Sequence, residues 1–389
     1  MRILQVISTF YPSLAFGGPA KVAYGISKEL AARGHEVEVF ATNAYDQTQD
    51  FKPKSKETVL HGFKVTYFNN LVKFGNIFVS TEMNSALRKR VKEFDVIHAH
   101  YGRQGHDIIM SNYARKHAVP YVLQPHGSLP RIMAMQASKL SYDIFFGNRI
   151  MMGASKVIAL SQREADQAKA FGVSDKRIAI VPNGINLTEY ENFPSKGSFK
   201  KKYCVANNKK IILYLGRIHI TKRIDLLIKA YAHYIKTIDH NNTILVIAGP
   251  DDGYLAETIS LADSLGILDS VCFTGFIDDD DKLGAFVDAS LFVTPSFYGF
   301  PMTFLEACLA GLPIVTTNFG DSLDWIDDIV GEVTSPTESD LATALQLMLS
   351  DSTLLQQYSM NGKELVKSKF SINATVDKLV QIYEDAARR

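Results

Sequence analysis

Cysteine is scarce in this chain of 389 residues, which holds only three. Because Cys204, Cys272 and Cys308 lie far apart, their spacing indicates neither a disulfide framework nor a zinc site. Long hydrophobic runs are missing too, since no stretch approaches the roughly eighteen apolar residues that predict a membrane-spanning helix. The apolar run at the N-terminus breaks at Tyr11-Pro12, too early for a secretory signal, so we expect a cytoplasmic protein.

Low-complexity tracts are also absent, and a composition of 46% hydrophobic and 21% charged residues is typical of a soluble globular protein. The length suits two domains, each with its own core. The net charge of +1 hides an uneven distribution: residues 1–200 hold 26 basic and 16 acidic residues, whereas residues 201–389 hold 16 and 25. The basic half predicts a weak peripheral contact with an anionic membrane, with a merely solvated basic face as the open alternative, and nothing points to nucleic acid. The cations behind this prediction include Lys52, Lys54, Lys56, Arg88, Lys89, Arg90 and Lys92.

Strand-like and helix-like segments alternate along the chain, which predicts parallel α/β sheets. In the first half, strands are predicted at residues 2–8, 35–42, 94–100, 120–127, 155–161 and 177–185. Near residue 200 the pattern restarts, with strands at residues 210–215, 243–250, 270–276, 289–296 and 311–317. We therefore predict two Rossmann-like domains, residues 1–193 and 194–371, and a closing helix over residues 372–389. Ligands of open parallel sheets bind beyond the carboxyl ends of the strands, so the loops there are candidate sites.

Glycines and cations occupy equivalent turns in the two halves. Gly17 and Gly18 follow the first strand, where glycine lets the backbone approach a ligand at a helix N-terminus. Arg217 and Lys222 follow the strand at residues 210–215, and a guanidinium together with an ammonium suits a diphosphate. Two alternatives stay open: an ordinary turn at the glycines, and two solvated surface cations.

A single charge, Glu306, interrupts the apolar run from residue 289 to residue 320. A buried unpaired carboxylate is costly, so Glu306 either faces solvent on an amphipathic helix or meets a partner. The loop containing Gly299 leads into a predicted helix, and Glu306 lies about one turn inside it. There its carboxylate can accept hydrogen bonds from ribose hydroxyls. The backbone N–H groups that can meet phosphate are those of Met302, Thr303 and Phe304.

Polar residues also follow strands of the first half. His126 comes directly after a strand and a proline, so we expect it to point toward a ligand, with a structural role as the alternative. We interpret His98 and His100 as mainly structural. Asn183-Gly184 is a turn signal whatever else it does.

Four segments resemble, in order, the signatures of family 4 glycosyltransferases: GGPAKVAYGISKELAARGHEVEV, VPNGI, LGRIHITKR and GFPMTFLEACLAGLPIV. The resemblance spans almost the entire chain. It implies the GT-B fold, in which two Rossmann-like domains face a central cleft and the final helix crosses back to the N-terminal domain. It also implies a retaining transferase that uses a nucleotide-sugar and needs neither a metal nor another cofactor.

The resemblance implies roles for the candidate residues. Arg217 and Lys222 would bind the donor diphosphate and stabilise the departing nucleotide, while Gly17 and Gly18 approach the same phosphates. Glu306 corresponds to the second glutamate of the family's E-x7-E motif, which holds the donor ribose. His126 corresponds to a histidine near the donor sugar and the acceptor, and it joins Arg217 and Lys222 as a catalytic candidate. The other donor-binding candidates are Asn183, Tyr298, Gly299, Met302, Thr303 and Phe304.

Three positions depart from the family pattern. Tyr298 stands where the first glutamate normally contacts sugar hydroxyls, Arg223 replaces a frequent glycine, and Asn186 replaces a frequent aspartate. The predicted activity is sugar transfer to a glycan or lipid-linked acceptor in cell-envelope polysaccharide or glycoconjugate synthesis, at the inner face of the cytoplasmic membrane. The main alternative is an inactive, transferase-like binding or regulatory subunit. A GT-B sugar-nucleotide epimerase is a second alternative.

Overall fold

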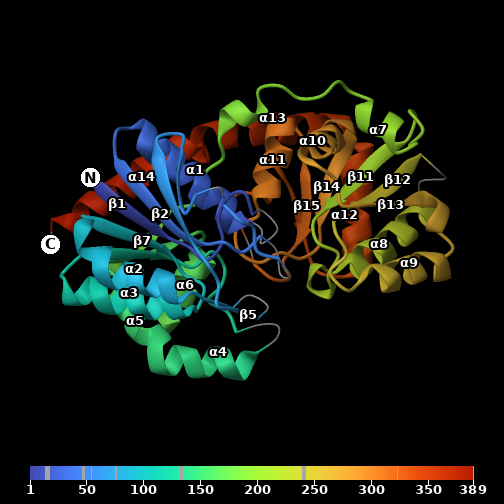
Figure 1. The fold of residues 1–389 in the computed structure, drawn as a ribbon. Coiled ribbons are helices and arrows are strands. Elements are labelled where there is room, and N and C mark those ends of the chain that lie inside the picture. The colour runs from blue at the N-terminus through green and yellow to red at the C-terminus, as the bar shows by residue number, and fades with distance from the viewer. Residues whose placement is uncertain are drawn as a thin grey trace. The chain divides into compact units, whose positions relative to one another are not determined.

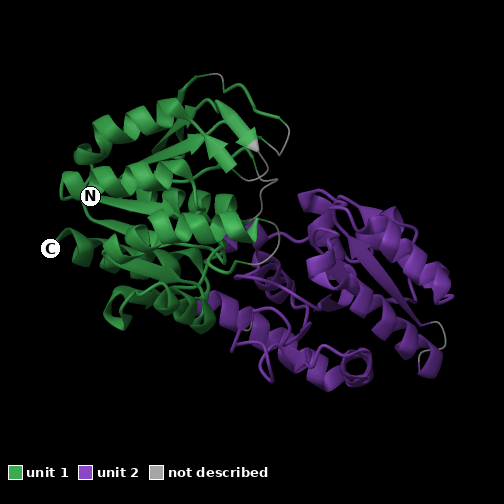
Figure 2. Cartoon of the chain, turned by 90° about the horizontal axis from the view of Figure 1, so that it is seen from below, with its two compact units in different colours: residues 1–186, 370–389 green, residues 187–369 purple. Residues whose placement is uncertain are grey.

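The computed structural model describes residues 1–13, 18–45, 49–53, 55–74, 77–131, 135–238, 242–321 and 323–388. The chain forms two compact units (Figure 1, Figure 2). Unit 1 comprises residues 1–186 and 370–389, and unit 2 comprises residues 187–369. Each unit is built on its own sheet.

The sheet of unit 1 has the strand order β10-β9-β8-β7-β1-β2-β4-β3. Neighbouring strands pair in parallel, as predicted, and β3 joins the edge antiparallel to β4. A separate antiparallel pair, β5 with β6, was not predicted. The strands are β1 (Arg2–Val6), β2 (Glu36–Thr42), β3 (Glu57–Leu60), β4 (Phe63–Phe68), β5 (Val72–Phe74), β6 (Ile77–Val79), β7 (Val96–His100), β8 (Tyr121–Gln124), β9 (Lys156–Ala159) and β10 (Ile178–Ile180).

Helices cover both faces of this sheet. They are α1 (Gly18–Ala32), α2 (Thr81–Arg90), α3 (Gly105–Lys116), α4 (Gln136–Tyr142), α5 (Asn148–Gly153), α6 (Gln162–Ala170) and α14 (Ile372–Ala387), with the π-helical turn η2 (Asp143–Gly147) between α4 and α5. Figure 1 shows α1 and α14 over one face and α2 and α3 over the other. Leu4, Ile97 and Leu123 belong to the apolar core with α2 and α3. Because side chains alternate along a strand, Gln5, His98 and Gln124 share the opposite face.

The C-terminal segment belongs to unit 1. Ile372 N donates a hydrogen bond to Ile185 O (2.9 Å), and Ile185 N donates to Phe370 O (2.8 Å). Gly184 lies directly against the start of α14, since a Cβ there would lie 2.8 Å from Ile372 Cα. The Asn183-Gly184 pair therefore provides close packing for the final helix as well as a turn.

The sheet of unit 2 has the strand order β13-β12-β11-β14-β15-β16, again with parallel pairs. The strands are β11 (Lys210–Leu215), β12 (Thr243–Ala248), β13 (Val271–Gly275), β14 (Ala289–Thr294), β15 (Ile314–Thr317) and β16 (Gly331–Thr334). The helices are α7 (Ser198–Lys202), α8 (Ile224–Thr237), α9 (Leu255–Ser264), α10 (Asp279–Asp288), α11 (Met302–Ala310), α12 (Glu338–Ser350) and α13 (Ser352–Lys369), with short 3₁₀ turns η4 (Leu187–Tyr190) and η5 (Ile220–Lys222).

Apolar residues on both faces hold unit 2 together. Ile212 and Leu245 pack with α8 and α12 in one cluster. On the other face, the Phe292 ring meets Phe286 of α10 and Phe304 of α11 edge-on, with ring centroids 5.6 and 5.9 Å apart. The sheet is thereby fixed on both sides, and the loops at its carboxyl edge project from a rigid base.

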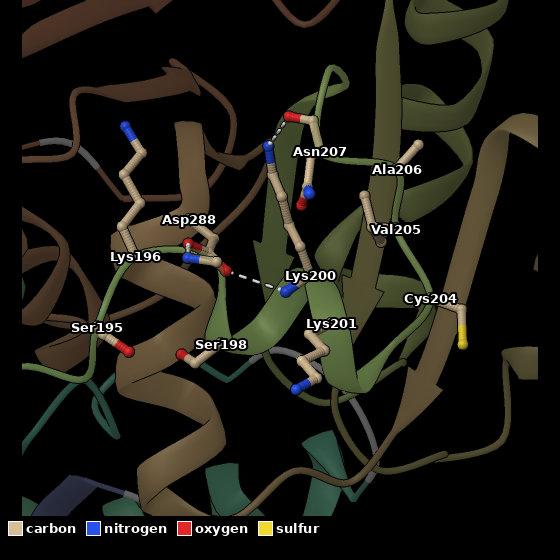
Figure 3. Close-up of a pocket in the computed structure, with 11 residues that line it drawn as sticks. Ser195, Lys196, Ser198, Lys200, Lys201, Cys204, Val205, Ala206, Asn207 and Asp288 are labelled. Atoms are coloured by element: carbon tan, nitrogen blue, oxygen red, sulfur yellow. Dashed lines mark hydrogen bonds between the residues drawn. The ribbon is translucent and has the colours of Figure 1, made fainter.

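A hollow of about 1010 Å³ lies beside α7 (Figure 3). Asp288 accepts hydrogen bonds there from the backbone N–H of Gly197 (2.5 Å) and of Lys200 (3.0 Å). Lys200 Nζ donates to the Asn207 carbonyl oxygen (3.0 Å). These contacts fasten α7 to the end of α10, and the residues lining the hollow, from 195–207 and position 288, include no predicted site residue.

Candidate active site

The turn after β11 brings Arg217 and Lys222 to the carboxyl end of the unit 2 sheet. Gly216 follows β11 directly, and Lys222 closes η5 just before α8. Gly249, after β12, packs against this turn, because a Cβ at this position would lie 1.9 Å from the Gly216 carbonyl oxygen. Its φ of 144° also requires glycine. The two loops are therefore held together beside the cations.

Arg217 and Lys222 have different environments. The Arg217 side chain is about half exposed, and its Nη1 lies 2.5 Å from Asp252 Oδ2. Burial, and in second place the positive charge of Arg217, lower the pKa of Lys222 to about 8. An anion bound by both cations would raise the pKa of Lys222 again, because a nearby negative charge favours the ammonium form. The electrostatics of the pair are those of a site for an anionic group such as phosphate.

The lone charge of the apolar run has partners within unit 2. Glu306 is buried in α11, with only 3% of its surface exposed. Its Oε1 accepts a hydrogen bond from the Tyr190 hydroxyl (2.6 Å) and an ion-pair contact from Lys282 Nζ (3.2 Å). Burial and the neighbouring Glu306 carboxylate raise the pKa of Tyr190, so the phenol remains a donor. A solvated surface carboxylate is therefore the wrong alternative for Glu306.

The loop between β14 and α11 carries the remaining candidates of unit 2. Gly299 has a φ of 75°, and its N–H donates to Asp321 Oδ2 over 2.5 Å. Tyr298 is partly exposed beside it, whereas the Phe304 side chain is buried against Phe297. Residues 302–304 form the first turn of α11, where Phe304 N donates to the Pro301 carbonyl oxygen (3.2 Å). Phe304 thus belongs to the core through its ring.

In unit 1, His126 lies at the end of a chain of buried polar side chains. His126 Nε2 lies 2.7 Å from His100 Nδ1, and His100 Nε2 lies 2.6 Å from Gln5 Oε1. The backbone of His126 has a φ of 54°, the left-handed region. The next residue is fixed by Glu164, which accepts hydrogen bonds from Gly127 N (2.6 Å) and from Leu160 N (2.7 Å). The imidazole of His126 is therefore held through both its ring and its loop.

This chain of hydrogen bonds determines the tautomers. Burial lowers the pKa of His100 well below its usual range and that of His126 to about 3, so both rings are neutral at pH 7. With the Gln5 amide oriented as in the structure, Gln5 Oε1 requires a proton on His100 Nε2. His100 Nδ1 then accepts from His126 Nε2–H, which leaves His126 Nδ1 without a proton. That nitrogen is buried and has no hydrogen-bond partner among the described residues.

His98 has a separate partner on the last helix. Its Nδ1 lies 2.7 Å from the Tyr383 hydroxyl of α14, although 285 positions separate the two residues in the sequence. Both side chains are fully buried. This contact supports the structural interpretation of His98, whereas His100 contacts the site candidate His126.

The glycine turn and Asn183 complete the candidates of unit 1. Gly18 is exposed at the start of α1, and Gly17 lies outside the described residues. Asn183 is buried, and its Oδ1 lies 3.5 Å from Gln124 Nε2. Asn183 is thus linked to the polar face of the sheet that carries His100.

Sequence reasoning missed the partners of the predicted residues. Asp252, four residues past the end of β12, occupies a strand-end position that the topology rule could have singled out. Tyr190 and Lys282 lie 116 and 24 positions from Glu306, and no local pattern connects them to it. The same holds for Gln5 and His100, which are 95 positions apart.

The described residues include neither a metal-binding group nor a membrane-spanning helix. They contain no group of three or more His, Cys, Asp or Glu side chains placed to hold a metal ion. Within the same residues, the helices include none with the length and hydropathy that crossing a membrane requires.

Comparison with known proteins identifies the family. The model of Glycosyltransferase Family 4 matches residues 16–189, and the model of Glycosyl transferases group 1 matches residues 195–365. An uncharacterized glycosyltransferase of Methanocaldococcus jannaschii is 25% identical over 398 residues, which cover 98% of each chain. The N-acetyl-alpha-D-glucosaminyl L-malate synthase of Bacillus anthracis is 25% identical over 402 residues, 99% of this chain and 98% of that protein.

A solved structure confirms the predicted fold. HepE of Anabaena, solved in complex with UDP, has a TM-score of 0.78 at 19% identity, covering 99% of this chain and all of that one. HepE has also been solved with UDP-glucose. The two parallel-sheet units and these matches agree with the GT-B architecture. The chain therefore belongs to the family 4 glycosyltransferases of the GT-B fold, and it is a glycosyltransferase.

Proposed function

We propose that this glycosyltransferase moves a sugar from a nucleotide-sugar to a hydroxyl group of a glycan or lipid-linked acceptor, with retention of the anomeric configuration. We place the reaction in the synthesis of cell-envelope polysaccharide or glycoconjugate. The observation that carries the proposal is the pair Arg217 and Lys222 at the carboxyl end of β11, where the pKa of the lysine is lowered to about 8.

The pair fits a leaving group whose negative charge grows during the reaction. As the bond between the sugar C1 and the phosphate oxygen breaks, its electron pair stays on the nucleoside diphosphate. Arg217 and Lys222 stabilise that charge more strongly in the transition state than in the bound substrate. Two side-chain cations supply this stabilisation without a metal ion, so we propose metal-independent transfer.

The configuration at the sugar C1 is retained when the acceptor attacks C1 from the same face from which the phosphate departs. The acceptor oxygen forms the new bond to C1, and the departing phosphate oxygen takes the acceptor proton. This route needs no protein nucleophile. The hydrogen bonds from Gln5 through His100 leave His126 Nδ1 without a proton. We propose that this nitrogen accepts a hydrogen bond from a hydroxyl group of the donor sugar or of the acceptor substrate.

The other donor contacts are distributed over the loop after β14. Glu306 is proposed to hold the ribose, with Tyr190 and Lys282 orienting its carboxylate. Tyr298 and Gly299 are proposed to lie along the sugar, and the first turn of α11 (Met302 and Thr303) near the phosphates. Gly18 and Asn183 of unit 1 stay donor-binding candidates on the family resemblance, as does Gly17, which lies outside the described residues. The UDP complexes of HepE support UDP-sugars as the first donors to test.

A thermal-shift screen against UDP-, GDP-, ADP- and dTDP-sugars identifies the donor, because a ligand that binds the native state raises the unfolding midpoint. Transfer assays with that donor and NMR of the anomeric proton of the product then test the reaction. An α-linked product from an α-linked donor is expected. An inverted product contradicts retention, and a stabilising donor that is never turned over favours the regulatory subunit. Free epimerised sugar favours the epimerase.

A further inference from the structure

The segment from α4 through η2 to α5 exposes large apolar side chains. Ile144 is 61% exposed and Phe145 71%, and Leu140 and Phe146 are each 43% exposed. We call these four residues the α4–η2 apolar surface. Figure 1 shows α4 at the outer edge of unit 1. Single exposed apolar residues are common, but a contiguous group of this size marks an interaction surface.

The helical geometry makes these side chains contiguous. In a π-helical turn the hydrogen bonds run from residue i to residue i+5, so Leu140, Ile144 and Phe145 lie on one side of the segment. Phe146 extends the surface, since its ring centroid lies 6.4 Å from that of Phe145 and 5.7 Å from that of Tyr142.

Polar contacts of neighbouring residues in the same segment hold Ile144 and Phe145 in their exposed positions. Asp143 is fully buried and binds Arg103 Nε (2.8 Å) and Arg131 Nε (2.8 Å). Gly147 packs closely, since a Cβ there would lie 2.8 Å from Asp143 Oδ1. The Tyr142 hydroxyl donates to the Gln104 carbonyl oxygen (2.9 Å). Ile144 and Phe145 therefore face outward because their neighbours are anchored.

Three arginines lie on or beside α5, the helix that continues from this surface. Arg149 follows Phe145 by four residues, about one helical turn. Arg177 Nη1 donates to the carbonyl oxygens of Met152 and Ala154, and a Cβ at Gly153 would lie 3.6 Å from Arg115 Cδ, so both cations lie at the end of α5. Arg115 donates to a side-chain amide and Arg177 to backbone carbonyls, so no carboxylate of the described chain neutralises them. From residue 135 to residue 153 the sole acidic residue is Asp143, which is buried.

We propose that the α4–η2 apolar surface inserts into an anionic lipid bilayer, with Arg115, Arg149 and Arg177 binding the lipid phosphates. Aromatic and aliphatic side chains flanked by cations are the pattern of an interfacial helix. A second copy of the chain fits less well, because a two-fold interface would bring the same arginines of both copies together. This inference goes beyond the proposed function and does not depend on the identity of the donor.

The cations singled out in the sequence form a different surface and are partly neutralised. Arg90 binds both carboxylate oxygens of Glu38 at 2.8 Å, and Lys56 Nζ lies 2.7 Å from Glu82 Oε2. Lys54 lies outside the described residues. The apolar surface with its arginines is therefore the better candidate for membrane contact within unit 1.

Flotation with vesicles of phosphatidylcholine, with or without phosphatidylglycerol, tests the proposal. The wild-type protein should float with the anionic vesicles at low salt, and Ile144→Ser/Phe145→Ser should reduce the bound fraction at least tenfold. Val59→Ser/Leu71→Ser is the matched control, since both residues are about as exposed (72% and 69%) and lie elsewhere in unit 1. Arg149→Gln should weaken binding and flatten its dependence on salt.

Two further measurements separate this proposal from the proposed function. The affinity for UDP, measured by calorimetric titration, and the unfolding midpoint should both be unchanged in these variants. The membrane proposal is overturned if the wild type does not float with anionic vesicles. It is also overturned if the Ile144→Ser/Phe145→Ser variant floats as well as the wild type. Sedimentation that shows a wild-type dimer dissociated by the same two substitutions would identify a second copy as the occupant and also overturn it.

Discussion

The Tyr190 hydroxyl donates a hydrogen bond to Glu306 Oε1 over 2.6 Å, joining the turn η4 to the helix α11. Lys282 Nζ reaches the same oxygen at 3.2 Å. The one charge in the apolar run from residue 289 to residue 320 is therefore oriented by a phenol and balanced by an ammonium group. A buried carboxylate held by two partners has a fixed direction, as a residue that binds hydroxyl groups requires.

Glu306→Gln should weaken nucleotide binding and turnover together. A neutral amide forms weaker hydrogen bonds with ribose hydroxyls than a carboxylate does, a loss of about 1–2 kcal/mol. Calorimetric titration with the nucleoside diphosphate measures it. Tyr190→Phe is the control, because it keeps the carboxylate and removes only one orienting bond, and it should have a smaller effect. If Glu306→Gln binds the diphosphate as tightly as the wild type does, the Glu306 carboxylate contacts Tyr190 and Lys282 and does not bind the ribose.

Tyr298→Phe should change the rate or the sugar preference and leave the affinity for the bare nucleoside diphosphate unaltered. The phenol stands where the family has a glutamate that contacts sugar hydroxyls, and it offers one hydroxyl in place of a carboxylate. Comparing the binding of the nucleoside diphosphate with that of the intact nucleotide-sugar separates the two contributions. Loss of diphosphate binding would instead assign Tyr298 to the nucleotide pocket.

Nucleotide affinity should fall as the pH rises through about 8. Burial and Arg217 lower the pKa of Lys222 to about 8 in the free protein, so the ammonium form that attracts phosphate is lost above that pH. Binding should also take up protons near pH 8.5, because the bound anion raises the lysine pKa again. Titrations in buffers of different ionisation enthalpy measure this uptake. Lys222→Arg should abolish it, and uptake that persists in this variant would show that another group titrates.

Gln5→Leu should change the tautomer of His126. Without the Gln5 oxygen, nothing requires the proton on His100 Nε2, and both rings become free to exchange tautomers. NMR of protein labelled with ¹⁵N-histidine should show Nε2-protonated rings for His100 and His126 in the wild type and a mixture in the variant. A His126 ring protonated on Nδ1 in the wild type would refute the proposed acceptor role.

Sequence reasoning succeeded for the positions of residues that depend on local order along the chain. Arg217 and Lys222 follow a strand at a turn, and strand ends carry ligand sites in any open parallel sheet. It failed where a contact joins distant segments, as for Glu306 with Tyr190 or His98 with Tyr383, because no periodicity records which helix will cover which strand. Asn183-Gly184 was predicted as a turn, but the closeness of Ile372 to Gly184 is a property of the packed unit and not of the dipeptide.

The most direct test of the account is the kcat/KM for sugar transfer of Lys222→Ala and Arg217→Ala, each measured against Lys229→Ala. Lys229 is an exposed lysine on α8, seven residues after Lys222, so its removal alters the charge without touching the proposed site. The account predicts that each of the two site variants loses a hundredfold or more in rate, about 3 kcal/mol of transition-state stabilisation, with an unchanged unfolding midpoint. Lys229→Ala should retain wild-type activity. Near-wild-type turnover by Lys222→Ala or Arg217→Ala would contradict the assignment of this pair to the leaving diphosphate.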